Sequence, residues 1–135
     1  MNSKIKFLTV VLALFSFAFS SAQLETCALG EARGEGVNGM RAIISAIENR
    51  KSLSGVYGCT ADLSRVTPKE REKAKEALRL ARSGKDITLG ADHWGNKKDV
   101  IIFKRSKWFK NVRKTVKIGN HYFFKSKKPK TKKGK

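Results

Sequence analysis

Two glutamates, Glu31 and Glu35, flank one Arg-Gly pair in the segment ALGEARGEGVNGMRAIISAIENR, residues 28–50. A glutamate at the end of an apolar helix, against a core, has its charged form disfavoured by desolvation, and such a carboxylic acid can donate a proton to a leaving oxygen. Glu31 fits this description. The same residues also fit a solvated helix end in which the carboxylates pair with Arg33 or Arg41. Spacing alone leaves both interpretations open.

Other catalytic chemistries find less support in the sequence. The two cysteines and two histidines do not have the spacing of a zinc site. There is no G-x-S-x-G nucleophile elbow and no glycine-rich phosphate loop. We therefore expect neither a metal nor a cofactor, and acid–base chemistry by a carboxylate remains.

The first 22 residues have the three parts of a secretory signal peptide. Lys4 and Lys6 give a positive start, FLTVVLALFSFAF is an uncharged apolar run, and SSA places small residues at Ser20 and Ala22. The run is shorter than the about 20 residues of a membrane span. We expect a mature chain that begins near Gln23 and is secreted, periplasmic or attached to the cell wall.

Export affects the interpretation of Cys27 and Cys59, because a cysteine pair in an oxidising compartment favours a disulfide. The bond would close a loop of about 30 residues and stabilise the fold by roughly 3 to 4 kcal/mol. The alternative is two small buried thiols.

Charge is polarised along the sequence. The chain has 30 Lys and Arg against 11 Asp and Glu, and every charged residue from Lys104 onward is basic. Residues 127–135 form a basic tail, which we expect to be disordered and to bind polyanions non-specifically. In an exported protein the polyanions within reach are anionic polymers of the cell envelope, so no specific nucleic acid partner is expected. One domain, residues 23–126, remains.

Two consecutive helices are predicted to position Glu31. Apolar residues recur at helical spacing over 24–32 and 37–50, and Gly34 separates the two segments. Glu31 then lies in the last turn of the first helix. The apolar stripe of the second consists of Val37, Met40, Ile43, Ile44 and Ile47.

A third helix is predicted from its end signals. Thr67, Pro68 and Glu70 form the pattern of an N-terminus with a capping box, and Gly84 stops the helix. The preceding residues 51–66, rich in Ser and Gly, are predicted to be a loop.

Strands are predicted after the helices. Residues 87–94 and 99–103 are strand-like, and residues 116–124 form a hairpin turned at Gly119 and Asn120. Helices first and a small antiparallel sheet last indicate the α+β class.

Four sequence elements occur in an order that resembles a known family. They are GEARGEGVNGMRAIISAIENRKS, GVYGC, GADHWGN and IGNHYFFK. The set resembles the cell wall hydrolases of the spore cortex-lytic, SleB-like family, lysozyme-like enzymes that cleave the glycan strand of peptidoglycan. The resemblance covers most of the mature chain. It implies a small domain of the lysozyme-like or lytic-transglycosylase-like kind, with peptidoglycan glycan strands as substrate.

The resemblance also implies roles for single residues. Glu31, the first glutamate of E-A-R-G-E, would be the catalytic residue. Asn49 and Arg50 would have packing and capping roles. Sugar rings stack on aromatic faces, so Trp94 and Tyr122 suit a glycan cleft, although they also suit the core of a small sheet. The implied substrate-binding residues are Glu35, His93, Trp94, His121 and Tyr122.

The chain departs from the family pattern in two places. The stretch between Cys59 and Thr67 is shorter than usual, and so is the helix before Glu31. Part of the cleft wall is then missing, which affects substrate specificity more than fold.

The number of available carboxylates favours one reaction. Glycosidases ordinarily use two carboxyls about 5 to 9.5 Å apart. A lytic transglycosylase needs one, which protonates the glycosidic oxygen and then takes the proton of the sugar's C6 hydroxyl to close a 1,6-anhydro ring. We therefore expect a transglycosylase. We also expect it to be a monomer. The alternatives are a hydrolase of the same fold, N-acetylmuramidase-like, and a non-catalytic secreted cationic protein that binds walls or is antimicrobial.

Overall fold

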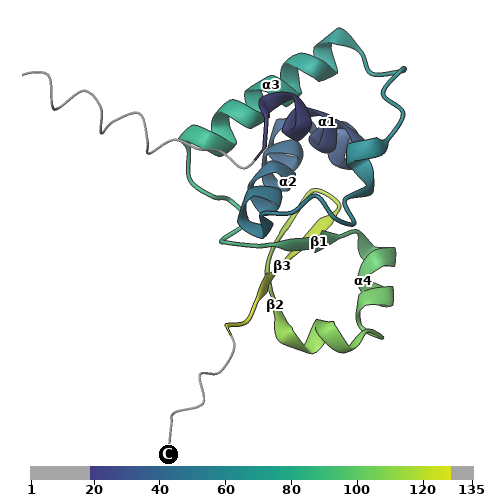
Figure 1. The fold of residues 1–135 in the computed structure, drawn as a ribbon, viewed down its shortest axis with the longest axis vertical. Coiled ribbons are helices and arrows are strands. Elements are labelled where there is room, and N and C mark those ends of the chain that lie inside the picture. The colour runs from purple at the N-terminus through teal and green to yellow at the C-terminus, as the bar shows by residue number, and fades with distance from the viewer. Residues whose placement is uncertain (1–18, 129–135) are drawn as a thin grey trace, which may run out of the picture.

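The computed structural model describes residues 19–128, and Figure 1 shows how its helices and strands are arranged. The α-helices are α1 (Ser21–Ala32), α2 (Gly36–Arg50), α3 (Pro68–Ser83) and α4 (Lys97–Phe103). The strands are β1 (His93–Gly95), β2 (Val112–Ile118) and β3 (His121–Ser126). Short 3₁₀ segments are η2 (Arg33–Glu35), η3 (Tyr57–Thr60) and η4 (Lys107–Asn111). Three helices precede a small antiparallel sheet, so the predicted α+β class is confirmed.

Helix α1 begins three residues earlier than predicted because Ser20 caps it. The Ser20 hydroxyl accepts a hydrogen bond from the Gln23 N–H, and the Gln23 side chain accepts one from the Ser20 N–H. The expected cleavage site after Ala22 therefore lies in the first turn of α1. Residues 1–18, the rest of the predicted signal peptide, lie outside the described residues.

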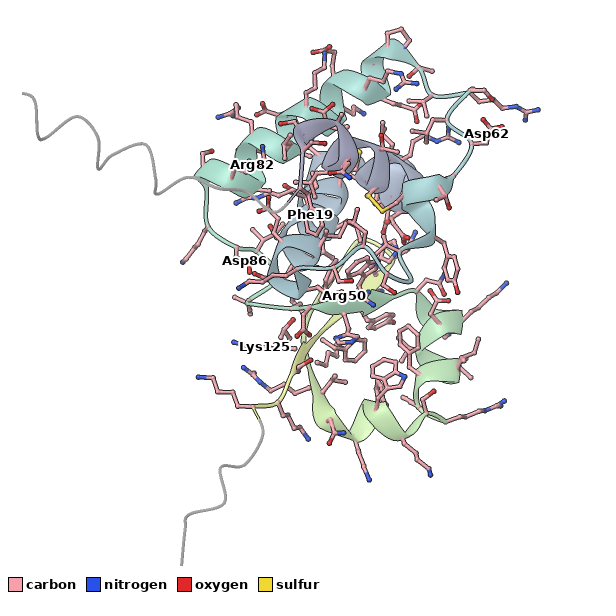
Figure 2. All side chains as sticks on the ribbon, viewed as in Figure 1. Phe19, Arg50, Asp62, Arg82, Asp86 and Lys125 are labelled. Carbon is pink, nitrogen blue, oxygen red and sulfur yellow. A yellow bond between two sulfur atoms is a disulfide. The ribbon has the colours of Figure 1, made fainter. Side chains whose placement is uncertain are left out.

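Arg82, near the end of α3, joins the start of the described chain to the helices. Its guanidinium donates to the Phe19 carbonyl and the Ser21 hydroxyl and lies 3.4 Å from a Glu48 oxygen. Figure 2 labels Arg82 and Phe19 at this junction. Two residues before the expected cleavage site, Phe19 and Ser21, are thus tied to α3.

Helix α2 is the core helix that the apolar stripe predicts. It packs against α1, α3, β1 and β2. Met40, Ile43, Ile44 and Ile47 are completely buried, whereas Val37 lies at the edge of the core. Burying such side chains stabilises the fold by about 1.5–3 kcal/mol each, so α2 fixes the position of the elements around it.

Helix α3 begins and ends where its sequence signals predict. The Thr67 hydroxyl accepts from the Glu70 N–H, and the Glu70 carboxylate accepts from the Thr67 N–H. At the other end, the Gly84 N–H donates to the Leu80 carbonyl. The predicted loop 51–66 contains one helical turn, η3.

The sheet has the strand order β1-β3-β2, with both pairs antiparallel. The predicted hairpin is confirmed: Ile118 lies opposite His121, so Gly119 and Asn120 form a two-residue turn. Gly119 has a φ of 57°, a left-handed value that glycine adopts without strain at the first position of a type II′ turn.

The prediction of a strand over residues 99–103 is wrong, because this segment is helix α4. The Asn96 side chain accepts from the Asp99 N–H, and the Asp99 carboxylate accepts from the Asn96 N–H. This reciprocal cap satisfies two N–H groups at the start of the helix, those of Asn96 and Asp99. It outweighs the strand preference of the run Val100, Ile101 and Ile102.

The strand predicted over residues 87–94 is largely wrong as well. Only its last two residues enter β1, and the rest forms a tight loop around Asp86. The Asp86 carboxylate accepts from the Thr88 N–H and hydroxyl and from the Gly90 N–H. Leu89 has a φ of 57°, which a turn tolerates and a strand does not.

The expected disulfide between Cys27 and Cys59 is present and joins α1 to η3.

At the C-terminal end of the domain, the Lys127 N–H donates to the Asn111 carbonyl, so ordered pairing continues one residue beyond the predicted domain boundary. The rest of the predicted tail, residues 129–135, lies outside the described residues. Between residues 19 and 128, no helix is long and apolar enough to span a membrane.

Candidate active site

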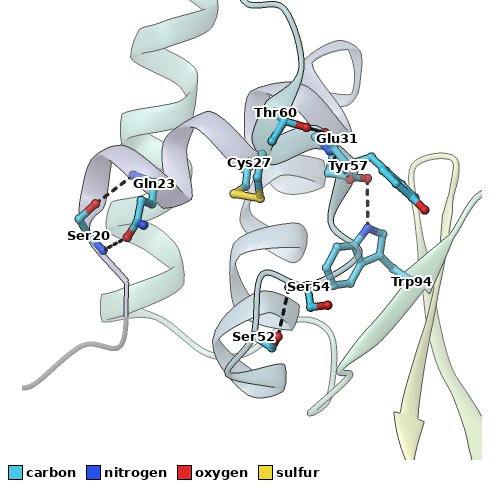
Figure 3. Close-up of a disulfide and its surroundings, with 11 residues drawn as sticks. Ser20, Gln23, Cys27, Glu31, Ser52, Ser54, Tyr57, Thr60 and Trp94 are labelled. Carbon is cyan, nitrogen blue, oxygen red and sulfur yellow. Dashed lines mark hydrogen bonds between the residues drawn. A yellow bond between two sulfur atoms is a disulfide. The ribbon is translucent and has the colours of Figure 1, made fainter.

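Glu31 lies in the last turn of α1 and is held through both carboxylate oxygens. Oε1 accepts a hydrogen bond of 2.8 Å from the Gly58 N–H, and Oε2 accepts one of 3.3 Å from the indole N–H of Trp94. Figure 3 shows Trp94 reaching Glu31 from β1, close to the disulfide. One side chain is thus oriented by a loop and by a strand.

Two glycines permit this arrangement. A Cβ on Gly30 would overlap the Gly58 carbonyl, and a Cβ on Gly58 would come within 2.5 Å of the Glu31 Cγ. The backbones of α1 and η3 can therefore approach only because both positions lack a side chain. Cys59, the residue after Gly58, forms the disulfide with Cys27 of α1, so a covalent bond holds the same contact.

Glu31 lies on the wall of a cavity of about 390 Å³. The cavity is bounded by α1, the end of α2, the loop before η3, β1, α4 and η4. Its lining residues are Glu31, Arg50, Gly55, Tyr57, His93, Trp94, Asp99, Phe103 and Trp108. Figure 2 labels Arg50 beside β1, at the end of α2.

Aromatic rings form one wall of this cavity. The rings of His93 and Trp108 stack with centroids 5.1 Å apart and an interplanar angle of 23°. Phe103 packs against Trp108 at 5.0 Å, and Tyr57 is 85% exposed at the rim. Flat aromatic faces with polar edges suit the stacking of sugar rings.

Asp92 fixes the orientation of His93. The Asp92 carboxylate lies 2.8 Å from the His93 Nδ1 and accepts the Ser126 N–H at 2.9 Å. Burial alone would raise the pKa of Asp92, but the hydrogen bonds from His93 and Ser126 outweigh it and lower that pKa. The Asp92 carboxylate therefore stays charged and holds the ring that stacks on Trp108.

A second cavity, of about 490 Å³, also has Glu31 in its wall. Its residues come from the end of α1, η2, the segment after η3 and the tip of the hairpin. Because Glu31 lines both cavities, a polymer that occupies both lies against this residue twice.

Glu35 and His121 form a buried pair in the wall of the second cavity. The Glu35 Oε2 lies 2.6 Å from the His121 Nδ1, and both side chains are only about a tenth exposed. The Glu35 Oε1 accepts the Asn120 N–H at 2.5 Å. Both Glu35 oxygens are therefore engaged in fastening the start of α2 to the hairpin.

The alternative of a solvated helix end is not supported by these contacts. Arg33 pairs with Glu70 on α3, and Arg41 donates to the Lys85 carbonyl. Neither arginine pairs with Glu31 or Glu35 within residues 19–128. The two carboxylates instead have separate partners.

The predicted site residues thus fall into two groups. Glu31, His93 and Trp94 line the first cavity, and Glu31, Glu35 and His121 line the second. Tyr122 lines neither of these two cavities. Its ring lies beside the ammonium groups of Lys114 and Lys117 instead.

Several lining residues escaped the sequence analysis. Phe103 was hidden by the wrong strand prediction, and Arg50 was given only packing and capping roles. Trp108 could have been found from the sequence. It stands next to Phe109 in a cationic segment, and adjacent large aromatic residues among lysines indicate a binding surface. Tyr57 and Asp99 carried no such signal. Among the described residues no three His, Cys, Asp or Glu side chains gather as metal ligands.

Two solved structures resemble this fold. The catalytic domain of the Bacillus cereus SleB protein is 26% identical with a TM-score of 0.53, and the match covers 78% of this chain and 88% of that one. The catalytic domain of the germination-specific lytic transglycosylase SleB from Bacillus anthracis is 29% identical with a TM-score of 0.53, covering 82% and 97%. No family model matches the sequence, and no curated protein does. The resemblance to the SleB-like family read from the motifs is confirmed.

Proposed function

We propose that the protein is a secreted lytic transglycosylase that cleaves the glycan strand of peptidoglycan, with Glu31 as general acid and then general base. The observation that carries this proposal is the position of Glu31 between two cavities, with both oxygens held by N–H donors. The likeness to a domain described as a lytic transglycosylase supports the same reaction.

The contacts of Glu31 suit both steps of such a reaction. In the first step the Glu31 carboxylic acid protonates the glycosidic oxygen as the bond to the sugar's C1 breaks. The N–H groups of Gly58 and Trp94 then stabilise the carboxylate that is left. In the second step this carboxylate takes the proton of the C6 hydroxyl, whose oxygen bonds to C1 and closes the 1,6-anhydro ring.

The other carboxylates at the two cavities have structural partners. Glu35 bonds to His121 and Asn120, Asp99 caps α4, and the Asp62 carboxylate accepts the Ser64 N–H. Figure 2 labels Asp62 in the loop before α3. Glu31, which neither caps a helix nor pairs with a histidine, is left for proton transfer, and one carboxylate suffices for a transglycosylase, whereas a hydrolase ordinarily needs two.

A hydrolase is the second candidate, and Asp99 is the observation that favours it. Asp99 lines the same cavity as Glu31, and only one of its oxygens accepts the cap bond. It would serve as the second carboxylate. Asp99→Asn should then abolish cleavage, whereas in a transglycosylase it should affect only the stability of α4.

Analysis of the products tests the proposal. Purified peptidoglycan is digested and the soluble fragments are separated and weighed by mass spectrometry. We expect fragments with 1,6-anhydromuramic ends. Reducing ends would make the enzyme a hydrolase. If no glycan is cleaved while walls are still bound, the secreted cationic binding protein replaces the enzyme.

A further inference from the structure

A third hollow, of about 380 Å³, lies beyond the second cavity. We call it the lysine pocket; its residues are Asn96, Lys97, Lys98, Lys117, Asn120 and Tyr122. They come from the start of α4, the end of β2, the hairpin turn and β3. Segments that are far apart in the sequence thus place three lysines at one hollow.

The lysine pocket has no negative charge of its own. No carboxylate lines it, and none of its lysines forms an ion pair with any acid between residues 19 and 128. Asp99 is near in sequence, but its carboxylate accepts the Asn96 N–H in the cap of α4. Three neighbouring ammonium groups repel one another, and a bound anion would remove that repulsion.

Tyr122 helps to keep positive charge at the pocket. The Lys117 Nζ lies 5.2 Å from the centre of the Tyr122 ring, and the Lys114 Nζ lies 5.0 Å from it. Both distances are within the range of cation–π attraction. The half-buried ring therefore limits how far Lys117 can swing away.

The lysine pocket adjoins the second cavity, which Glu31 lines. Asn96 and Asn120 line both this pocket and the second cavity. Their backbones are fixed, since the Asn96 N–H donates to Asp99 and the Asn120 N–H donates to Glu35. A strand bound across Glu31 can thus present its next groups to the lysines.

We infer that the lysine pocket is a subsite for an anionic group carried by the wall strand in the cleft. This inference rests on the proposed function for the identity of the strand. The chemistry that the lysines recognise is an anionic oxygen, which stem-peptide carboxylates and the phosphodiesters of wall-linked polymers both offer.

Binding measurements test the subsite separately from catalysis. All proteins carry Glu31→Gln, so that the strands stay intact during the measurement of Kd with soluble glycan strands. The pocket variant adds Lys97→Gln, Lys98→Gln and Lys117→Gln. The control variant instead adds Lys104→Gln, Lys107→Gln and Lys110→Gln, which remove the same charge from exposed sites outside the pocket.

We expect the pocket variant to bind strands about tenfold more weakly than its parent, because three exposed charge pairs each contribute modestly. The control variant should lose much less. Strands freed of stem peptides by an amidase lack the carboxylates, and strands treated with hydrofluoric acid lack phosphodiesters. The treatment that makes parent and pocket variant bind equally identifies the anion.

Equal losses in the pocket and control variants would overturn the inference, because net charge would then explain binding. A difference between parent and pocket variant that survives both treatments would overturn it as well. Should wild-type protein cleave none of the strands while the pocket variant still binds them more weakly, the proposed reaction fails and the subsite stands.

Discussion

Glu31 accepts hydrogen bonds from groups that are 27 and 63 residues away in the sequence. The E-A-R-G-E motif led us to expect Glu31 as the acid, but no local pattern could show that Gly58 and Trp94 would orient it. Gly58 in particular has no chemistry of its own and acts through the absence of a side chain. The proposal of Glu31 as the acid could therefore be made from the sequence, whereas the orientation of its side chain required the fold.

Replacing Glu31 by Gln tests the proton donor. Glutamine keeps the shape of the side chain but cannot donate a proton to the glycosidic oxygen. We expect the rate of peptidoglycan cleavage to fall by roughly 10² to 10⁴, as for other general acids, with an unchanged circular dichroism spectrum. Full activity of Glu31→Gln would rule out Glu31 as the proton donor.

Trp94→Phe separates the hydrogen bond to Glu31 from aromatic stacking. Phenylalanine keeps an aromatic face at the cavity and removes the N–H that donates to Glu31. A hydrogen bond to a charged group contributes about 1.5–3 kcal/mol, so kcat should fall by roughly tenfold or more with little change in KM. Steady-state kinetics on soluble glycan strands measure both constants.

Trp108→Phe is the matched control, because Trp108 lines the same cavity without contacting Glu31. Trp108→Phe should raise KM, because the stacking surface is smaller, and should leave kcat nearly unchanged. A loss of kcat equal to that of Trp94→Phe would show that the indole N–H of Trp94 has no special role.

At the scale of elements, predictions succeeded where capping and apolar periodicity agreed. Thr67 and Glu70 located the start of α3, and the stripe of α2 is buried as expected. The strand prediction for residues 99–103 failed because it rested on β-branched residues and did not consider the Asn96–Asp99 capping box. The loop at Asp86 failed because its order depends on hydrogen bonds to one carboxylate rather than on periodicity.

The disulfide should matter for both stability and activity. It links α1 to η3 across 32 residues, so its loss in Cys27→Ala/Cys59→Ala should cost roughly 3 to 4 kcal/mol of unfolding free energy. The Gly58 N–H should then contact Glu31 less often, and cleavage should slow even where the variant is folded. Denaturant unfolding and the cleavage rate at low temperature measure the two effects.

If the double variant retained the full cleavage rate, the contact between η3 and Glu31 would not depend on the disulfide. Thiol titration of the denatured, non-reduced wild-type protein is the companion measurement. It should find no free cysteine.

Asp86 should make the fold sensitive to acid. Burial alone would raise the pKa of Asp86, but hydrogen bonds from Thr88, Asn49 and the N–H of Gly90 outweigh it and lower that pKa. A lowered folded-state pKa stabilises the protein above the ordinary Asp value of about 3.9, and this stabilisation is lost as the pH falls through the folded-state value. Asp86→Asn should therefore destabilise the protein by about 1–3 kcal/mol at neutral pH.

The difference in stability between wild type and Asp86→Asn should shrink below about pH 4, because protonation removes the advantage of the carboxylate. Urea unfolding at a series of pH values measures it. A difference that stayed constant down to pH 2 would mean that the charge of Asp86 is not what the loop requires.

At the scale of the whole molecule, the charge polarity of the sequence becomes a polarity of the folded domain. Residues 19–96 contain 12 Lys and Arg against 10 Asp and Glu, whereas residues 97–128 contain 12 against one. The first group builds the helical part and β1, and the second builds α4 and the rest of the sheet, at the opposite end of the view in Figure 1. We expected polyanion binding from the tail alone, but the folded segment 97–128, which contains β2 and β3, is cationic as well.

Removal of residues 129–135 tests how the tail and the folded domain share attachment to the wall. This truncation removes four lysines and leaves Lys127, which pairs with Asn111, in place. Because the 12 basic residues of 97–128 remain, we expect weaker but not abolished binding to intact walls at low salt. Binding of the truncated protein should also depend less steeply on salt, since fewer charges contact the polymer. Cosedimentation with walls over a series of salt concentrations measures both, and the cleavage rate on short soluble glycans should stay unchanged.

A parallel loss on short glycans would place the tail in contact with the cleft, and complete loss of wall binding would leave the cationic half of the domain without a role in attachment.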